Sequence, residues 1–243
     1  MKTKRLVALF LVLLLALSAA SFAAAEEKAK GIEFNQNNLV IENGETVKLN
    51  VFYSPYSIYT EDGTYYNNIE FDCDSVVKGK VLSGGSWVTV TNSSKKDCAI
   101  KIDRNETSKA RTAKIKLTGT GYSATIVLTQ FGMARVISAK RSGKSVTLKL
   151  QKTTGAKVHY LGISSYSLNS DGVMDYNEYS YKRIFDGKYT KKSYKFSVKA
   201  GYQYEFDYGV AIKNKWGGYT WTSRYYSIDV TSVSGSQVYK FDE

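Results

Sequence analysis

Apolar and polar side chains alternate along two neighbouring segments near the middle of the chain. Ala113, Ile115 and Leu117 alternate with two lysines, and three apolar residues share one face again in residues 123–130. Successive residues of a strand point to opposite faces of a sheet. Because Gly119 and Gly121 lie between the segments, the pattern predicts a β-hairpin with one face on a core and the other in water.

Short apolar runs separated by turn residues continue through the rest of the chain from Gly31. Proline occurs once, at Pro55, and no stretch is strongly helix-forming. We therefore expect an all-β protein, and the length suits two consecutive β-sandwiches. The expected domains are residues 26–133 and 134–243.

The N-terminus has the pattern of a signal peptide. Lys2, Lys4 and Arg5 precede an apolar run over residues 6–17, and small residues surround Ala23 and Ala25. This order predicts a signal peptide over residues 1–25 with cleavage after Ala25. An uncleaved anchor is the alternative, since residues 6–25 are nearly long enough to span a bilayer. We expect a secreted, extracellular bacterial protein, free or held at the cell surface, with no integral membrane segment after cleavage.

The positive charge is concentrated in the second half. Without the three cations of the signal peptide, 31 basic and 22 acidic residues remain, a net charge of +9. Residues 26–133 contain 13 of each sign, whereas residues 134–243 contain 18 basic and 9 acidic residues. A basic exported module suits polyanionic cell-surface polymers, although such charge also serves solubility alone. The export signal argues against nucleic acid as a partner.

Two cysteines, Cys73 and Cys98, lie in the first expected domain. Export permits a disulfide between them, and two buried thiols are the alternative.

A set of short motifs in residues 31–132 resembles a known family. Trp87-Val-Thr-Val, Ile100-Lys-Ile, Asn105 with Thr107, the Arg-Thr-Ala run at Arg111 and the Thr-Gln-Phe-Gly run at Gln130 are similar to a BACON domain. The resemblance implies an immunoglobulin-like β-sandwich, a type often attached to secreted carbohydrate-active proteins and proposed to bind glycans or mucin. The resemblance identifies no ligand-binding residues in this sequence. We expect Trp87 in the core, because an indole at a strand start of a sandwich usually fills the interior.

The segment over residues 198–217 resembles the second half of a fibronectin type III domain. After Gly201 an aromatic corner leads into a long strand that ends in Asn214-x-x-Gly. Either Tyr204 or Phe206 could hold the corner. The resemblance implies a second β-sandwich, fibronectin type III-like, over residues 134–243.

One segment of the second domain has the spacing of a calcium loop. Oxygen-bearing side chains and a glycine fall in the order that such a loop requires, with ligands expected from Ser167, Asn169, Asp171, Asp175 and Glu178. The first position is Ser where Asp is usual, which removes a charge. The alternative is an Asn-Ser-Asp-Gly turn between two strands, and no other cofactor is expected.

An aromatic and basic loop is the main candidate for binding. Aromatic faces stack on flat ligands and neighbouring cations hold acidic groups; the expected site residues are Trp216, Tyr219, Trp221, Lys213, Lys215 and Arg224. Trp221 could instead pack beneath the hairpin. Fourteen of the 20 tyrosines also lie in residues 134–243, and tyrosine is common on recognition surfaces.

Catalysis has little support in the sequence. The only histidine, His159, has no accompanying nucleophile motif and is expected to face outward. Glu205 and Asp207 alternate on one strand, as Glu70, Asp72 and Asp74 do, and each group shares a face. We expect a non-catalytic protein that binds carbohydrate, a polysaccharide or an anionic cell-surface polymer. The alternatives are a protein-protein interaction or adhesion factor that contacts a surface protein, or a structural spacer.

Overall fold

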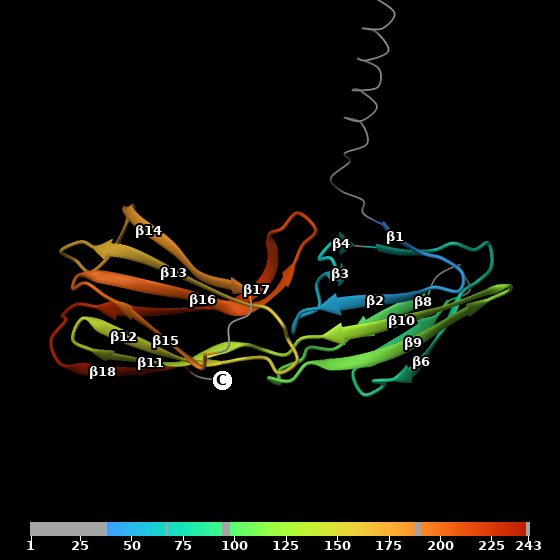
Figure 1. Ribbon diagram of the computed structural model, residues 1–243, viewed down its shortest axis with the longest axis horizontal. Helices are drawn as coiled ribbons and strands as arrows, with labels where there is room; N and C mark the ends of the chain where they lie inside the picture. Colours follow the sequence, from blue (N-terminus) through green and yellow to red (C-terminus); the bar gives the residue numbers. More distant parts are fainter. Residues whose placement is uncertain (1–37, 67, 94–97, 188–190, 242–243) are drawn as a thin grey trace, which may run out of the picture. The chain divides into compact units, whose positions relative to one another are not determined.

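The computed structural model describes residues 38–66, 68–93, 98–187 and 191–241. The expected signal peptide, residues 1–25, lies outside them. The described residues form an all-β structure with two consecutive β-sandwiches (Figure 1), as the sequence predicts. Within these ranges, no helix has the length and apolar character needed to cross a membrane.

The first sandwich has one large sheet and two small ones. The large sheet has the order β4-β3-β2-β10-β9-β6, and β1-β5 and β7-β8 form two-stranded sheets. Its strands are β1 (Asn38–Ile41), β2 (Thr46–Val51), β3 (Ile58–Thr60), β4 (Tyr65–Tyr66), β5 (Asn68–Phe71), β6 (Lys78–Ser83), β7 (Val88–Asn92), β8 (Cys98–Ile102), β9 (Arg111–Gly119) and β10 (Tyr122–Gln130).

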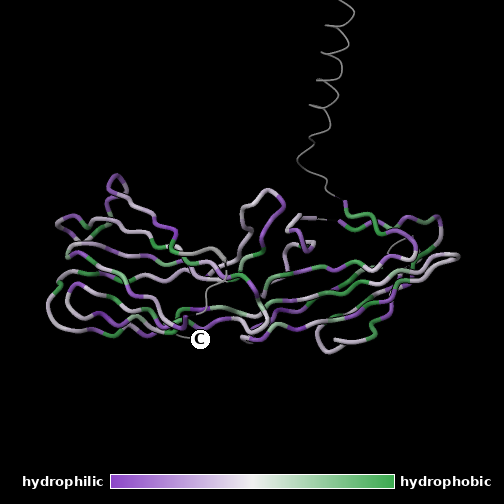
Figure 2. The backbone as a smooth tube through the Cα atoms, in the orientation of Figure 1, coloured by the Kyte–Doolittle hydropathy of each residue, from purple (hydrophilic) through white to green (hydrophobic). Residues whose placement is uncertain are grey.

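The predicted hairpin is β9–β10. Ala113, Ile115 and Leu117 are fully buried, whereas Lys114 and Lys116 are exposed. Gly121 closes the turn with a φ of 66°, a left-handed conformation that glycine adopts without strain. Alternating hydrophobic and hydrophilic residues can be followed along these strands in Figure 2. The alternation in the sequence therefore predicted correctly which side chains of the hairpin face the core and which face solvent.

The second sandwich consists of two four-stranded sheets, stacked as two layers (Figure 1). One has the order β15-β12-β11-β18 and the other β14-β13-β16-β17. The strands are β11 (Arg135–Ser142), β12 (Ser145–Gln151), β13 (His159–Leu168), β14 (Met174–Gly187), β15 (Ser193–Ser197), β16 (Tyr202–Lys213), β17 (Tyr219–Val230) and β18 (Ser236–Lys240).

A tyrosine corner links the turn before β16 to its first residues. The Tyr204 hydroxyl accepts a hydrogen bond from the Lys199 backbone N–H at 2.8 Å. Phe206 points into the core and is fully buried. Tyr204 therefore holds the corner that the sequence left open between these two residues, as in other sandwiches of this kind.

Candidate functional site

The motif residues of the first sandwich form an internal polar network. Gln130 is fully buried and donates through Nε2 to the carbonyls of Phe52, Tyr53 and Asp103, at 3.3, 3.1 and 2.9 Å. Its Oε1 accepts from Arg111 Nε at 2.8 Å. These bonds tie together three backbone segments and satisfy the polar groups of the buried Gln130 side chain.

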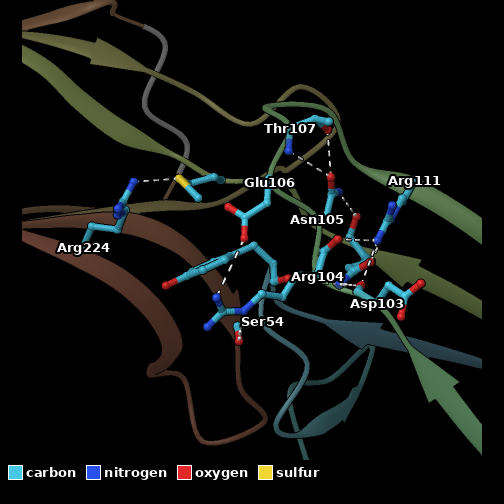
Figure 3. Close-up of polar contacts among 11 residues, drawn as sticks. Ser54, Asp103, Arg104, Asn105, Glu106, Thr107, Arg111 and Arg224 are labelled. Atoms are coloured by element: carbon cyan, nitrogen blue, oxygen red, sulfur yellow. Dashed lines mark hydrogen bonds and ion pairs between the residues drawn. The ribbon is translucent and has the colours of Figure 1, made fainter. Parts of the chain in front are cut away.

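The rest of this network is visible in Figure 3. Arg111 also donates to the carbonyls of Asp103 and Arg104, both at 2.8 Å, and Asn105 accepts from the Thr107 hydroxyl at 2.7 Å. Trp87 is buried, as predicted, with the Arg111 guanidinium 4.4 Å from the centroid of its ring. The Trp87, Arg111 and Gln130 side chains therefore serve the internal packing of the first sandwich.

The loop between β16 and β17 exposes an aromatic side chain, as predicted. Trp216 is 75% exposed, and Lys215 Nζ lies 5.1 Å from the centroid of its ring. Asn214 Oδ1 accepts the backbone N–H groups of Trp216 and Gly218, at 3.2 and 2.9 Å, and so fixes the turn. Lys213 is exposed and Tyr219 half-buried.

The six predicted loop residues do not form one cluster. Trp221 and Arg224 lie an odd number of residues apart on β17, so their side chains point to opposite faces of the sheet. Arg224 Nη1 lies 3.0 Å from Met133 Sδ, away from the loop tip (Figure 3). Trp221 stacks on Tyr160 of β13, with ring centroids 4.7 Å apart and an interplanar angle of 13°.

Trp221 belongs to an aromatic surface on the outer side of the sheet β14-β13-β16-β17. The inner side carries Leu161, Ile163 and Phe206, which are in the core. Strand periodicity and the cross-strand register place the alternate residues on the outer side. We call this surface the tyrosine face; its aromatic members are Tyr160, Tyr166, Tyr179, Tyr181, Trp221 and Tyr225.

The rings on the tyrosine face range from buried to almost fully exposed. Tyr225 is 76% exposed, Tyr179 51%, Tyr181 41% and Trp221 40%, whereas Tyr160 is covered by the Trp221 stack. Tyr166 packs against Tyr179 with centroids 5.1 Å apart. The face thus has a fixed aromatic base and exposed rings available to a ligand.

A hollow of about 200 Å³ opens within this face. One row of neighbouring residues crosses the four strands as Arg183, Gly162, Asp207 and Tyr225. A Cβ at Gly162 would overlap the Asp207 carboxylate and lie 2.7 Å from the Tyr181 hydroxyl. Glycine is therefore required where these side chains cross the strand. The hollow is lined by Ser164, Tyr166, Tyr179, Tyr181, Glu205, Asp207 and Tyr225.

Burial changes the electrostatics of the hollow. Asp207 is only 7% exposed, and desolvation raises its pKa to about 6, against smaller lowering effects from backbone N–H groups and Arg183. Desolvation also raises the pKa of the Tyr166 and Tyr181 hydroxyls, and the nearby carboxylates of Glu205 and Asp207 add to this. Both tyrosines therefore stay neutral hydrogen-bonding groups.

The other outer surface of the second sandwich is basic. Lys140 and Lys195 both neighbour Thr147, and Lys149 and Lys240 both neighbour Ser138, in the sheet β15-β12-β11-β18. All four lysines are exposed. We call this surface the lysine face. It accounts for part of the positive charge concentrated in this half of the sequence.

The predicted calcium loop is the turn of the β13–β14 hairpin. Asn169 Oδ1 accepts the backbone N–H groups of Asp171 and Val173, at 3.0 and 2.9 Å. Ser167 and Asp175 are paired across the two strands, and Glu178 lies further along β14. Within the described ranges, no group of three or more His, Cys, Asp or Glu side chains is placed to hold a metal ion. The loop has the hydrogen bonds of an Asn-Ser-Asp-Gly turn, and calcium binding stays a prediction.

Two further predictions concern single residues. His159 was expected to face outward, and this is wrong: it is 2% exposed, its Nε2 accepts the Thr153 N–H at 3.2 Å, and its ring stacks on Tyr208. Burial lowers the pKa of His159 to about 4, with a smaller contribution from Lys152. Cys73 and Cys98 are half-buried thiols beside the first core, and their disulfide stays a prediction.

Most of the tyrosine face was not predicted from the sequence. The available signals were the alternation of Tyr179, Tyr181 and Arg183 along one strand, and two glycines inside strands, Gly162 and Gly209. Glycine in a strand interior often marks a close approach of another group. These signals gave no indication of which strands would be neighbours.

The first sandwich is similar to a known protein family. No curated protein matches the chain. Among solved structures, the crystal structure of the chicken CNTN1 FN1–FN3 domains superposes with a TM-score of 0.29 and 12% identity, over 78% of this chain and 64% of that chain. Residues 78–131 match the BACON family, described as "Putative binding domain, N-terminal", so the part of the chain that contains the Trp87, Arg111 and Gln130 motifs is similar to a binding domain.

Proposed function

We propose that this chain is an exported, non-catalytic binding protein whose tyrosine face contacts carbohydrate. The observation that carries the proposal is the stacked pair Tyr160–Trp221 next to exposed rings on a regular sheet. A sheet holds such rings at fixed positions, and rigid aromatic side chains supply contact area at low entropic cost. Trp221 and Tyr225 are four residues apart on one strand, about 13 Å, so an extended polymer could contact both.

Affinity electrophoresis of residues 26–243 through gels that contain different soluble polysaccharides would test this proposal. We expect at least one polysaccharide to retard the unmodified protein. The Tyr225→Ala and Trp221→Ala variants should not be retarded by it. Tyr56→Ala is the matched control, because Tyr56 is 83% exposed on the first sandwich. If Trp216→Ala abolishes retardation and the tyrosine-face variants do not, the binding site is the loop and the proposal is wrong.

The second candidate function is binding of an anionic cell-surface polymer through the lysine face. The four exposed lysines on one sheet favour it, because clustered charge attracts polyanions at low salt. Retention on an anionic polymer that falls steeply with salt, and falls again in a Lys140→Ser, Lys149→Ser variant, would support this function. Saturable binding to a surface protein, without binding to any polymer, would instead favour an adhesion factor. If the protein binds neither, a role as a structural spacer is favoured.

The absence of catalysis is also a proposal. Glu205 and Asp207 share one outer face of the sheet and form part of the hollow. Release of reducing ends from a bound polysaccharide, lost in Glu205→Gln, would show that the chain is an enzyme. We expect no such release.

A further inference from the structure

We propose that the hollow on the tyrosine face binds the protonated amino group of an amino sugar, so that the carbohydrate is a polymer with free hexosamine amines. This inference rests on the proposed function and names the chemical class of its ligand. Neutral glycans need only stacking surfaces and hydrogen bonds. The residues around the hollow offer these and also a site for a cation.

Aromatic rings surround the hollow. Tyr166, Tyr179, Tyr181 and Tyr225 all line it, and they come from three strands of the sheet. Tyrosine rings carry a negative potential on their faces and attract a cation placed within about 6 Å. Several rings around one small space are the arrangement that recognises organic ammonium groups.

Two carboxylates add negative charge at the same place. Asp207 neighbours Tyr225 in the register and Glu205 neighbours Ser164, so both carboxylates belong to the wall of the hollow. A cation that interacts with Asp207 is Arg183, whose guanidinium lies 5.7 Å from the Tyr160 ring centroid. Two carboxylates against one guanidinium leave a local charge of −1 in a domain that is basic as a whole.

The existing contacts do not neutralise this charge. Glu205 Oε1 accepts from Gln203 Nε2 at 3.5 Å, and nearby backbone N–H groups of β13 and β16 favour the ionised form of Asp207 by lowering its pKa. These donors are neutral, so they orient the carboxylates without cancelling them. An incoming ammonium group, with three N–H donors, would supply both a charge and hydrogen bonds to the partly desolvated acids.

Size and surroundings favour a sugar as the carrier of the amine. A volume of about 200 Å³ is smaller than the usual range for a whole drug-sized ligand, about 300–1,000 Å³. It suits one polar group of a sugar ring whose flat side lies on the exposed Tyr225. An anionic polymer would be repelled here, and the lysine face on the other sheet suits it better.

Three oligosaccharides of equal length would test the inference by calorimetry: a glucosamine oligomer, its N-acetylated counterpart and a glucose oligomer. The protein is residues 26–243, with Glu205→Gln and Asp207→Asn combined as the test variant. Glu70→Gln with Asp72→Asn is the matched control, since these carboxylates are also two residues apart and are exposed on the first sandwich. Tyr225→Ala, at an exposed position, provides a second test that does not depend on the acidic residues.

We expect the glucosamine oligomer to bind at least tenfold more tightly than the other two, and the preference to disappear in the test variant but not in the control. Equal binding of all three, lost with Tyr225→Ala, would overturn the ammonium inference and leave the carbohydrate proposal intact. Binding of none would overturn both. Equally tight binding of a lysine oligomer would show that charge alone is recognised and would overturn the assignment to a sugar.

Discussion

Trp221 on β17 and Tyr160 on β13 stack almost parallel across the outer side of one sheet, with centroids 4.7 Å apart. The residues belong to strands that are separated by β16 in the sheet, so the stack bridges over the small residues Gly209 and Ala211 of that strand. The contact buries Tyr160 and fixes the orientation of Trp221. It thereby creates a rigid aromatic base from two residues 61 positions apart in the sequence.

The stack should contribute to stability as well as to binding. Trp221→Ala removes the ring contact and uncovers Tyr160, and we expect the free energy of unfolding to fall by about 1–2 kcal/mol, since an aromatic pair adds about 0.5–1.5 kcal/mol to the burial of its area. Urea denaturation would measure the change. Trp216→Ala, which removes a 75% exposed indole, should change stability by less than about 0.5 kcal/mol.

The buried carboxylate of Asp207 should make the fold less stable as the pH rises. Desolvation raises its pKa from the usual 3.8 to about 6, so between these values the folded chain holds a proton that the unfolded chain has lost. The Asp207 carboxyl therefore contributes on the order of 2–3 kcal/mol to the free energy of unfolding below about pH 4, and this contribution is lost as the pH rises through 6. Asp207→Asn should abolish this loss and stabilise the protein at pH 7. Unfolding curves from pH 4 to 8 that are unchanged by the substitution would contradict the assignment.

His159 should act in the opposite direction over nearly the same pH range. Burial lowers its pKa from 6.5 to about 4, so the unfolded chain binds a proton that the folded chain refuses. This stability is present above pH 6.5 and is lost as the pH falls toward 4, on the order of 3 kcal/mol. The native protein should therefore show a shallow profile from pH 4 to 6.5. In Asp207→Asn the free energy of unfolding should rise with pH, because the effect of His159 remains. In His159→Gln it should fall with pH, because the effect of Asp207 remains. Parallel profiles for the two variants would refute the prediction.

The buried amide of Gln130 should be essential to the first sandwich. Gln130→Met keeps the approximate volume but leaves the carbonyls of Phe52, Tyr53 and Asp103 without the Nε2 donor. The Asp103 and Tyr53 carbonyls keep donors from Arg111 and Asn105, whereas the Phe52 carbonyl and Arg111 Nε lose their bonds to Gln130. A buried polar group without a partner costs about 1–3 kcal/mol, so we expect a loss of about 2–4 kcal/mol. Gln237→Met, at an exposed position of β18, is the matched control. Equal denaturation midpoints for the two variants would show that the network is dispensable.

The local features of this chain can be read from its residues alone. Side-chain alternation assigned Ile115 and Leu117 to the core and Lys114 and Lys116 to solvent, because the strand period of two needs no knowledge of neighbours. The short motifs around Trp87 and Gln130 indicated a sandwich of the BACON type, and this similarity is found over residues 78–131. The exposure of Trp216 followed from its place in a glycine-containing turn.

Contacts between residues on different strands depend on how the strands pair and pack. His159 stacks on Tyr208 because β13 pairs with β16 in a register that sets His159 opposite Val210 and Leu161 opposite Tyr208. The residues of one strand do not show which ring of another strand they will meet. The same pairing brings Tyr181, Asp207 and Tyr225 from three strands around Gly162. Strand order and register are set by packing between residues distant in the chain, so the tyrosine face could not be located from local periodicity alone.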